Sequence, residues 1–255
     1  MFEDLKGRVA VITGGAGGIG YSIATAYAAQ GMDVALLDLS PKVAESAERL
    51  AAEHGVKSIG LPVDVTDPAA VETVFGGIEQ QLGTPTVLLA AAGLTITGDS
   101  VDYPPDKWRT VMGVNVDGVF YTTQSFARRA LKAGRPSSAI LISSMSAFAV
   151  NVPQRQAVYN ASKAAVHQLA ASLAVEWATD GLRVNTIAPG YVRTELTQEL
   201  MDREPELAKQ WIDRIPMGRM AEPEDLHGLA VYLASDASGY LTGQSVIIDG
   251  GYTAI

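Results

Sequence analysis

The sequence contains no cysteine and no long apolar run, and its basic residues are few. Without cysteine the chain forms neither disulfide bonds nor thiolate sites for metals or catalysis. Lys and Arg total 19 against 28 Asp and Glu, and they form no cluster, which argues against nucleic acid or an anionic membrane as a partner. No apolar run approaches the roughly 20 residues that cross a bilayer.

The amino-terminal residues MFEDLKGRVAVITGG resemble neither a signal peptide nor a transit peptide, because acidic residues come first and a strand pattern follows at once. We therefore expect a cytoplasmic protein. The histidines at positions 54, 167 and 227 lack the spacing of metal ligands, so we expect no catalytic metal.

Short apolar runs alternate with stretches of helical period along the chain. Its 255 residues, 47% of them apolar, suffice for one large α/β domain with a substantial core. The β–α alternation predicts a single domain over 1–255, a doubly wound sheet of about seven parallel strands with helices on both faces. The expected strands are 9–13, 34–38, 58–63, 86–91, 138–143, 184–188 and 245–249.

Several helix ends are marked by glycine, proline or aspartate. The patterns over 19–30 and 41–54 each stop at a glycine, and Asp67 before Pro68 is an expected N-cap for a helix that ends near Gly83. The segment 191–217 breaks the alternation, because it follows a strand yet carries short helical patterns before a helix expected from Pro223. Ligands of such sheets bind at the carboxyl ends of the strands, so this segment is a candidate substrate lid.

The segment TGGAGGIG occupies 13–20, between the first expected strand and the first expected helix. Small residues there let the backbone approach a pyrophosphate, and the helix start offers free N–H groups and a positive dipole end. The segment predicts a dinucleotide site with the register Gly15-Gly17-Gly20 or Gly14-Gly18-Gly20. A glycine-rich turn without a ligand is the alternative.

Acidic residues close the second and third expected strands. Asp38 stands where a carboxylate accepts hydrogen bonds from the adenosine ribose and repels a 2′-phosphate. No cation lies in the glycine turn or directly after Asp38, so we expect NAD rather than NADP. Asp64, with Val65, is placed to border the adenine. As alternatives, Asp38 caps the next helix and Asp64 is an ordinary turn residue.

The sequence YNASK places Tyr159 and Lys163 one helical turn apart on the same face. An ammonium group beside a phenol lowers the phenol pKa from its usual value near 10. Tyr159 would then serve as the general base of alcohol oxidation and the general acid of ketone reduction. On spacing alone, a solvated helix face is the alternative.

Three serines end the fifth expected strand and begin the loop after it. The hydroxyl of Ser144 is placed to hydrogen-bond a substrate oxygen and stabilise developing charge. Ser143 and Ser146 are rivals for that role. Serines that only satisfy the backbone at the strand end are the alternative for all three.

In their order and content, these motifs resemble the short-chain dehydrogenase/reductase family over about 7–251. The resemblance implies a Rossmann-type fold, a nicotinamide cofactor, a homotetramer and the glycine register that includes Gly14. The motifs that carry it are Thr13-Gly14-x-x-x-Gly18-x-Gly20, Asn115 in VNVDG, Ser144, Tyr159-x-x-x-Lys163 and Pro189-Gly190-x-x-x-Thr194.

The resemblance also implies roles for single residues. Ser144, Tyr159, Lys163 and Asn115 would be catalytic, with Lys163 also holding the nicotinamide ribose and Asn115 stabilising a helix kink and anchoring a water. Thr194, for which a helix cap is the alternative, would bind the nicotinamide carboxamide. The expected cofactor-binding residues are Gly14, Gly18, Ile19, Gly20, Asp38, Asp64, Val65, Ala91, Gly93, Asn115, Tyr159, Lys163, Pro189, Gly190, Val192 and Thr194.

The chain departs from the family pattern in two places. The usual Asn-Asn-Ala-Gly is here 90–93, Ala-Ala-Ala-Gly, which removes polar side chains that tie the central strand to its neighbours. The commoner distance from serine to tyrosine selects Ser146. Aligning SSMSA on the family's Ser-Ser-x-x-Gly favours Ser144 instead, with two extra residues in the loop at 152–156.

Segments at 150–154, 173–178 and 216–223 are similar to the polyol and ketose branch of the family, whose members act on galactitol, arabinitol or sorbose. The amides of Asn151, Gln154 and Gln156 suit a pocket that must pair several buried hydroxyls, and a solvated loop is the alternative. The expected substrate-binding residues are Ser144, Ser146, Asn151, Gln156, Tyr159 and Tyr191.

The sequence therefore predicts an NAD-dependent oxidoreductase that transfers hydride between nicotinamide and a secondary alcohol or ketone, with a polyol or ketose as substrate. A 3-oxoacyl thioester or steroid reductase of the same family is the nearer alternative. It calls for a basic patch or a long apolar lid, whereas 191–217 is rich in polar and acidic residues. A non-catalytic NAD-binding protein is the remote alternative.

Overall fold

The computed structural model describes residues 2–255. Its centre is a parallel sheet in the order β3-β2-β1-β4-β5-β6-β7, so the predicted doubly wound sheet is confirmed. Every predicted strand is present, with ends within about two residues of those expected. The strands are β1 (Val9–Thr13), β2 (Asp33–Asp38), β3 (Ser58–Pro62), β4 (Val87–Ala90), β5 (Ser137–Ile142), β6 (Leu182–Pro189) and β7 (Ser245–Ile248).

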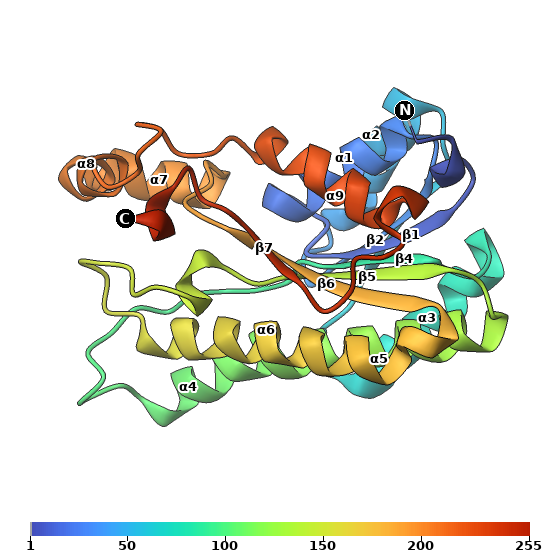
Figure 1. Cartoon of the computed structure of the whole chain (residues 1–255), viewed down its shortest axis with the longest axis horizontal. Coiled ribbons are helices and arrows are strands. Elements are labelled where there is room, and N and C mark those ends of the chain that lie inside the picture. The colour runs from blue at the N-terminus through green and yellow to red at the C-terminus, as the bar shows by residue number, and fades with distance from the viewer. Residues whose placement is uncertain (1) are drawn as a thin grey trace.

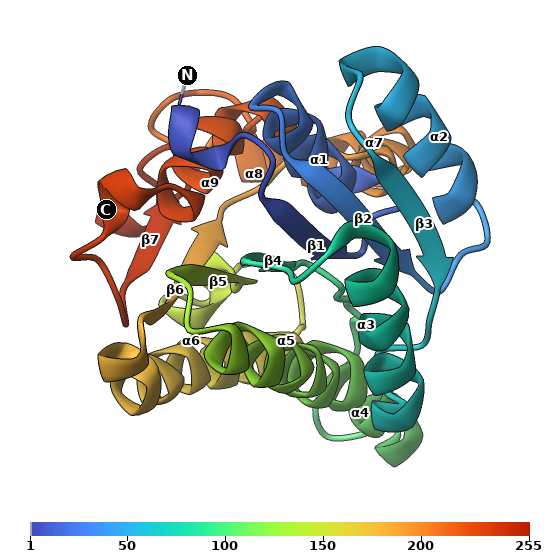
Figure 2. The ribbon, with the colours of Figure 1, turned by 90° about the vertical axis from the view of Figure 1, so that its right-hand side faces the viewer.

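Helices cover both faces of the sheet (Figures 1 and 2). One layer holds α1 (Gly18–Ala29), α2 (Val43–His54) and α9 (His227–Ala234), and packs through one large apolar cluster. The opposite layer holds α3 (Pro68–Leu82), α4 (Pro105–Met112), α5 (Val119–Ala133) and α6 (Ala157–Trp177), of which α3, α5 and α6 pack through a second cluster. A π-helical turn, Gly113–Gly118, joins α4 to α5.

Capping residues fix the start of α3 and the end of α2, as the sequence predicted. The Asp67 carboxylate accepts the N–H groups of Ala69 and Ala70 at the start of α3. Gly55 ends α2 with a φ of 68°, a left-handed conformation that favours glycine. Helix α2 begins at Val43 rather than at 41 as predicted, because the N–H of Val43 bonds back to the Ser40 carbonyl in a turn.

The segment 191–217 forms two short helices at the carboxyl ends of the strands, α7 (Glu195–Arg203) and α8 (Pro205–Ile212), on the left of Figure 1. A third apolar cluster packs α8 against the loop after β5 and the chain's last turn; it contains Met145, Trp211, Ile215, Met220 and Tyr252. The helix predicted from Pro223 starts as a 3₁₀ turn, Pro223–Leu226, that leads into α9.

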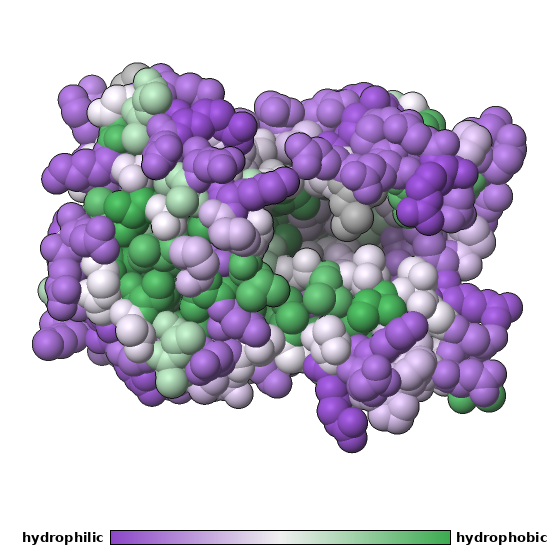
Figure 3. All heavy atoms as spheres, turned by 180° about the vertical axis from the view of Figure 1, so that it is seen from behind, coloured by the Kyte–Doolittle hydropathy of each residue, from purple (hydrophilic) through white to green (hydrophobic). Residues whose placement is uncertain are grey.

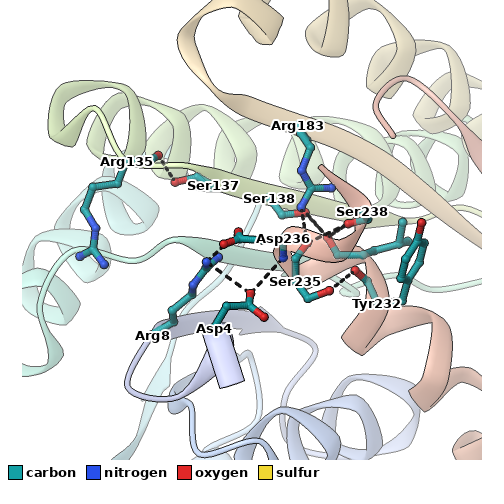
Figure 4. Close-up of polar contacts among 11 residues, drawn as sticks. Asp4, Arg8, Arg135, Ser137, Ser138, Arg183, Tyr232, Ser235, Asp236 and Ser238 are labelled. Carbon is teal, nitrogen blue, oxygen red and sulfur yellow. Dashed lines mark hydrogen bonds and ion pairs between the residues drawn. The ribbon is translucent and has the colours of Figure 1, made fainter. Parts of the chain in front are cut away.

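At the opposite side of the sheet, by the amino ends of its strands, a polar cluster joins distant parts of the chain (Figure 4). The Arg183 guanidinium donates to the carbonyls of Leu233 (2.9 Å) and Ser235 (3.1 Å), which satisfies the carboxyl end of α9. Arg8 contacts Asp236 at 2.7 Å, and Asp4 accepts the Asp236 N–H at 2.9 Å. The amino-terminal segment and the residues that follow α9 therefore meet here.

From behind, the surface is hollowed between the two helix layers, toward the carboxyl ends of the strands (Figure 3). Apolar side chains gather on this face beside the hollow (Figure 3). In 2–255, no helix is long and apolar enough to cross a membrane.

Candidate active site

The glycine turn between β1 and α1 has a backbone that few other residues can form. Gly14 and Gly18 have φ values of 68° and 54°. A Cβ on Gly20 would lie 2.1 Å from the Gly14 carbonyl oxygen, which would force the turn apart. By contrast, a Cβ on Gly17 would meet nothing within 4 Å. A Cβ on Gly15 would lie 2.9 Å from the Leu36 Cβ, so glycine is required at positions 14, 15, 18 and 20 but not at 17.

The start of α1 fits a bound pyrophosphate. No side chain caps this helix, so its first N–H groups have no side-chain acceptor. Ile19 follows in the first turn and packs partly against the core. A Cβ on Gly18 would lie 3.7 Å from the Thr194 methyl group, so the residue after β6 lies beside the turn. An anion held by helix N–H groups fits this arrangement.

Asp38, at the end of β2, is fastened to the same turn. One carboxylate oxygen accepts the Ala16 N–H at 3.0 Å and the other accepts the Ser40 N–H at 2.9 Å. Each oxygen keeps a further lone pair for a ligand hydroxyl. The carboxylate thus places a negative charge beside the turn where a ribose would lie.

Asp64 is a turn residue, as the alternative to an adenine contact predicted. It is exposed, and one of its oxygens accepts both the N–H (2.9 Å) and the hydroxyl (2.8 Å) of Thr66. The next residue, Val65, is buried, and a Cβ on Gly118 would lie 2.6 Å from a Val65 methyl group. Val65 therefore fixes the distance between the end of β3 and the π-helical turn.

The missing asparagines after β4 are replaced by a contact from β1. The Thr13 hydroxyl accepts the N–H groups of Ala91 and Ala92, both at 3.1 Å. The central strands are therefore tied together by a side chain on β1 and the backbone on β4. The carboxyl end of β6 is also closely packed, since a Cβ on Gly190, after Pro189, would lie 2.7 Å from the Asp249 Cα.

Asn115 is fully buried in the π-helical turn and links it to two neighbours. Its side-chain oxygen accepts the Leu94 N–H at 2.8 Å, and its amide donates to the Leu94 carbonyl (2.9 Å) and the Ser162 hydroxyl (2.9 Å). A Cβ on Gly93 would lie 3.2 Å from Lys163 Nζ and 3.4 Å from Asn115 Oδ1, so these groups converge. π turns are frequent at functional sites.

Tyr159 and Lys163 lie on one face of α6, with Nζ 5.7 Å from the centre of the tyrosine ring. Lys163 is 3% exposed, and Nζ donates to the Ile142 carbonyl at 2.9 Å. Burial lowers the pKa of Lys163 to about 8. Near neutral pH the ammonium form still predominates, held beside the phenol by the end of β5.

The expected pKa of Tyr159 requires a correction. Burial raises it above its ordinary value, and a hydrogen bond with Ser144 lowers it only in part. Lys163 does not offset the loss of hydration, because its ammonium lies beside the ring and bonds to a carbonyl. In the protein alone Tyr159 is therefore a neutral phenol, suited to donate a proton.

The hydroxyl groups of the three serines after β5 point to different partners. Ser143 turns away, because its hydroxyl donates to the Lys163 backbone carbonyl at 2.9 Å. Ser144 contacts Tyr159, and its oxygen accepts the Ser146 N–H at 3.1 Å. Ser146 donates to Asn151 Oδ1 at 2.6 Å. The geometry therefore brings Ser144, rather than Ser143 or Ser146, to the tyrosine.

A polar network continues from the serines to Tyr191. Asn151 is buried and donates to the Tyr191 hydroxyl at 3.3 Å, while the Gln154 amide donates to the same hydroxyl at 3.0 Å. Gln156 donates to Asn151 Oδ1 at 3.2 Å. The predicted substrate residues thus form one connected group beside Ser144 and Tyr159.

Sequence reasoning did not find Trp211 and Tyr252 at this site. Trp211 stacks on Tyr191, with ring centres 4.6 Å apart and an angle of 11°, and Tyr252 meets Tyr191 edge-on at 5.8 Å. No spacing or motif in the sequence indicates a site role for either residue. Val192 is buried just after β6 and pairs with Ala221, which closes the base of the 191–217 segment.

A family model described as enoyl-(acyl carrier protein) reductase matches residues 14–253. Two curated relatives match nearly the whole chain: a sorbose reductase of Candida albicans, 42% identical over 98% of this chain and 88% of its own, and the galactitol 2-dehydrogenase of Cereibacter sphaeroides, 41% identical over 98% and 96%. The chain belongs to the short-chain dehydrogenase/reductase family. It is an NAD(P)-dependent oxidoreductase that acts on CH–OH groups.

Solved structures of the family show the same fold. A short-chain type dehydrogenase/reductase from Mycobacterium marinum superposes with a TM-score of 0.94 at 38% identity, covering 100% of this chain and 98% of that one. The family members differ in cofactor. An NADPH-dependent quinuclidinone reductase of Rhodotorula rubra has a TM-score of 0.91 at 38% identity over 100% and 94%, and an NADH-dependent L-xylulose reductase of Ambrosiozyma monospora is 37% identical over 97% and 96%.

Proposed function

We propose that this dehydrogenase uses NAD(H) to interconvert a polyol and the corresponding ketose. The observation that carries this proposal is the connected, uncharged polar network from Ser144 through Ser146 and Asn151 to Tyr191. A substrate with several hydroxyls can pair with the donors and acceptors that these side chains do not use among themselves. An apolar substrate would take those groups from water without a partner, at a cost in free energy. The sorbose reductase and galactitol dehydrogenase relatives support the same substrate class.

The proposed catalytic residues are Ser144, Tyr159, Lys163 and Asn115. Bound nicotinamide would supply or accept the hydride. Tyr159 donates a proton to the ketone oxygen in reduction and accepts one from the alcohol in oxidation, and Ser144 stabilises the charge on that oxygen. Lys163 would hold the cofactor ribose, and Asn115 holds the backbone of Leu94 through its side-chain amide.

The decisive experiment is a panel of hexitols, pentitols and their ketoses assayed with both cofactors by the absorbance of the reduced nicotinamide. We expect turnover of at least one polyol–ketose pair, with a higher kcat/KM for NAD than for NADP. Measurable NAD binding without turnover of any panel member would favour the non-catalytic alternative. Turnover confined to 3-oxoacyl thioesters or steroids would overturn the proposed substrate class.

The preference for NAD is proposed to rest on the Asp38 carboxylate. Removing its charge as Asp38→Asn should lower the ratio of kcat/KM for NAD to that for NADP by about tenfold or more, because repulsion of a 2′-phosphate disappears. The matched control is Asp33→Asn, at the other end of β2. An unchanged ratio in the Asp38 variant would remove the argument for NAD.

The segment 191–217 is proposed as a lid over the substrate, within one domain over 1–255. Its helices α7 and α8 lie at the carboxyl ends of the strands, and α8 packs directly against the loop that carries Met145. The homotetramer and the cytoplasmic location stay predictions.

A further inference from the structure

The loop between β5 and α6 carries the predicted substrate amides but makes few contacts through its own backbone. Over 150–154 it forms neither helix nor strand. Within 2–255, the backbone of this stretch takes part in one hydrogen bond, in which the Val152 carbonyl accepts from Arg214 Nη1 at 2.7 Å. The position of the stretch therefore depends on its side chains and on that one backbone contact.

The side chains on either side of Val152 reach into the candidate active site. Asn151 is 2% exposed, and its side-chain oxygen accepts the Ser146 hydroxyl at 2.6 Å. The amides of Asn151 and Gln154 both donate to the Tyr191 hydroxyl, at 3.3 Å and 3.0 Å. A shift of the Val152 carbonyl would therefore move both amides relative to the serine that accepts or donates beside the reacting oxygen.

Arg214 reaches this loop from the candidate lid. It follows α8, at the left end of Figure 1, and its N–H bonds to the Trp211 carbonyl at 3.2 Å. The next residue, Ile215, is 5% exposed in the third apolar cluster, which fixes the base of the arginine. The guanidinium is exposed, and the neighbouring Asp213 pairs with Lys209 instead. Among the described residues, no carboxylate therefore competes with the loop for this guanidinium.

We propose that Arg214 is a positioning residue that latches the lid to the loop, and so holds the amides of Asn151 and Gln154 where remote substrate hydroxyls bind. This rests on the proposed polyol dehydrogenase function. A hydrogen bond from a charged donor is stronger than one between neutral groups, and this one must break whenever the lid leaves the loop. The remaining guanidinium N–H groups stay hydrated, because the side chain is exposed. Arg214 thus acts through the loop rather than on the substrate.

The test compares Arg214→Met with wild type on a hexitol and on a vicinal butanediol, whose hydroxyls lie only at and beside the reacting carbon. Methionine keeps part of the apolar stem but donates no hydrogen bond. We expect KM for the hexitol to rise about fivefold, on the scale of one exposed hydrogen bond, with kcat within about twofold of wild type. KM for the butanediol and the affinity for NAD should not change, because neither ligand depends on the loop amides.

A double-mutant cycle asks whether Arg214 acts through the loop. In a Gln154→Ala background, Arg214→Met should raise KM for the hexitol by less than it does in wild type, because one of the amides that it positions is gone. The charge control is Lys209→Met, which removes a cation from the same part of the lid, where the ammonium contacts Asp213. Its KM for the hexitol should match wild type.

The possible results separate the latch from the proposed function. An unchanged KM for the hexitol in Arg214→Met, equal rises on both alcohols, or additive effects in the cycle would each overturn the latch and leave the proposed function intact. An equal rise in Lys209→Met would assign the effect to charge and also overturn the latch. A wild-type enzyme that oxidises no polyol overturns the proposed function, and this inference with it.

Discussion

Tyr159→Phe is expected to lower kcat by a factor of about 10² to 10⁴ while leaving the affinity for NAD nearly unchanged. The substitution removes one hydroxyl, the group that contacts Ser144 and exchanges the proton with the substrate oxygen. The measurement is steady-state turnover of the best polyol, combined with NAD binding by fluorescence titration. Tyr240→Phe is the control, because Tyr240 is fully exposed.

The same variant tests the assignment of the proton donor. Because the pKa of Tyr159 is raised in the protein alone, the neutral phenol is the resting form, and ketone reduction should be less sensitive to rising pH than alcohol oxidation. More than about a tenth of wild-type kcat in Tyr159→Phe would contradict a general acid and base role for this residue.

Lys163→Met is expected to be nearly inactive and yet more stable than wild type at pH 7. The folded protein holds the Lys163 pKa at about 8, below its ordinary value of 10.5, so burying the ammonium costs about 3 kcal/mol below pH 8. Methionine removes that cost. It also leaves the Ile142 carbonyl without its donor, which destabilises the variant by about 1–2 kcal/mol. A net gain of about 1–2 kcal/mol in the free energy of unfolding should remain.

The sign of the pH dependence distinguishes this explanation from a packing effect. Between pH 8 and 10.5 the unfolded wild type binds more protons at this lysine than the folded protein does, so wild-type stability rises with pH through that window. The advantage of Lys163→Met should therefore shrink as the pH rises. Denaturant unfolding at pH 7 and pH 10 measures it, and a variant less stable than wild type at pH 7 would refute the argument.

The sheet was predictable because its strands are short apolar runs, several of them with glycine or aspartate at their ends. The caps at Gly55 and Asp67 were predictable for the same reason, since a left-handed turn or a side-chain acceptor is a local requirement. The start of α2 at Val43 was not predictable, because the helix pattern in the sequence also includes Pro41 and Lys42. In the structure these two residues form a turn from Ser40 instead.

The site was predictable where the chemistry is local and unpredictable where it depends on burial. Spacing along one helix places Tyr159 beside Lys163, and both are where the sequence indicated. The raised pKa of Tyr159 follows from desolvation, which no motif encodes. The stack of Trp211 on Tyr191 joins residues across an irregular segment, so periodicity gives no sign of it.

The cluster around Arg183 at the amino edge of the sheet bears on how the protein is made. Asp4 and Arg8 emerge from the ribosome first, but Asp236, the residue that both contact, follows more than two hundred positions later. Contacts so distant in sequence form late, because closing a long loop must precede them. The nascent chain must therefore wait for almost its last helix before these contacts form, long after β1 can pair with β2 and β4.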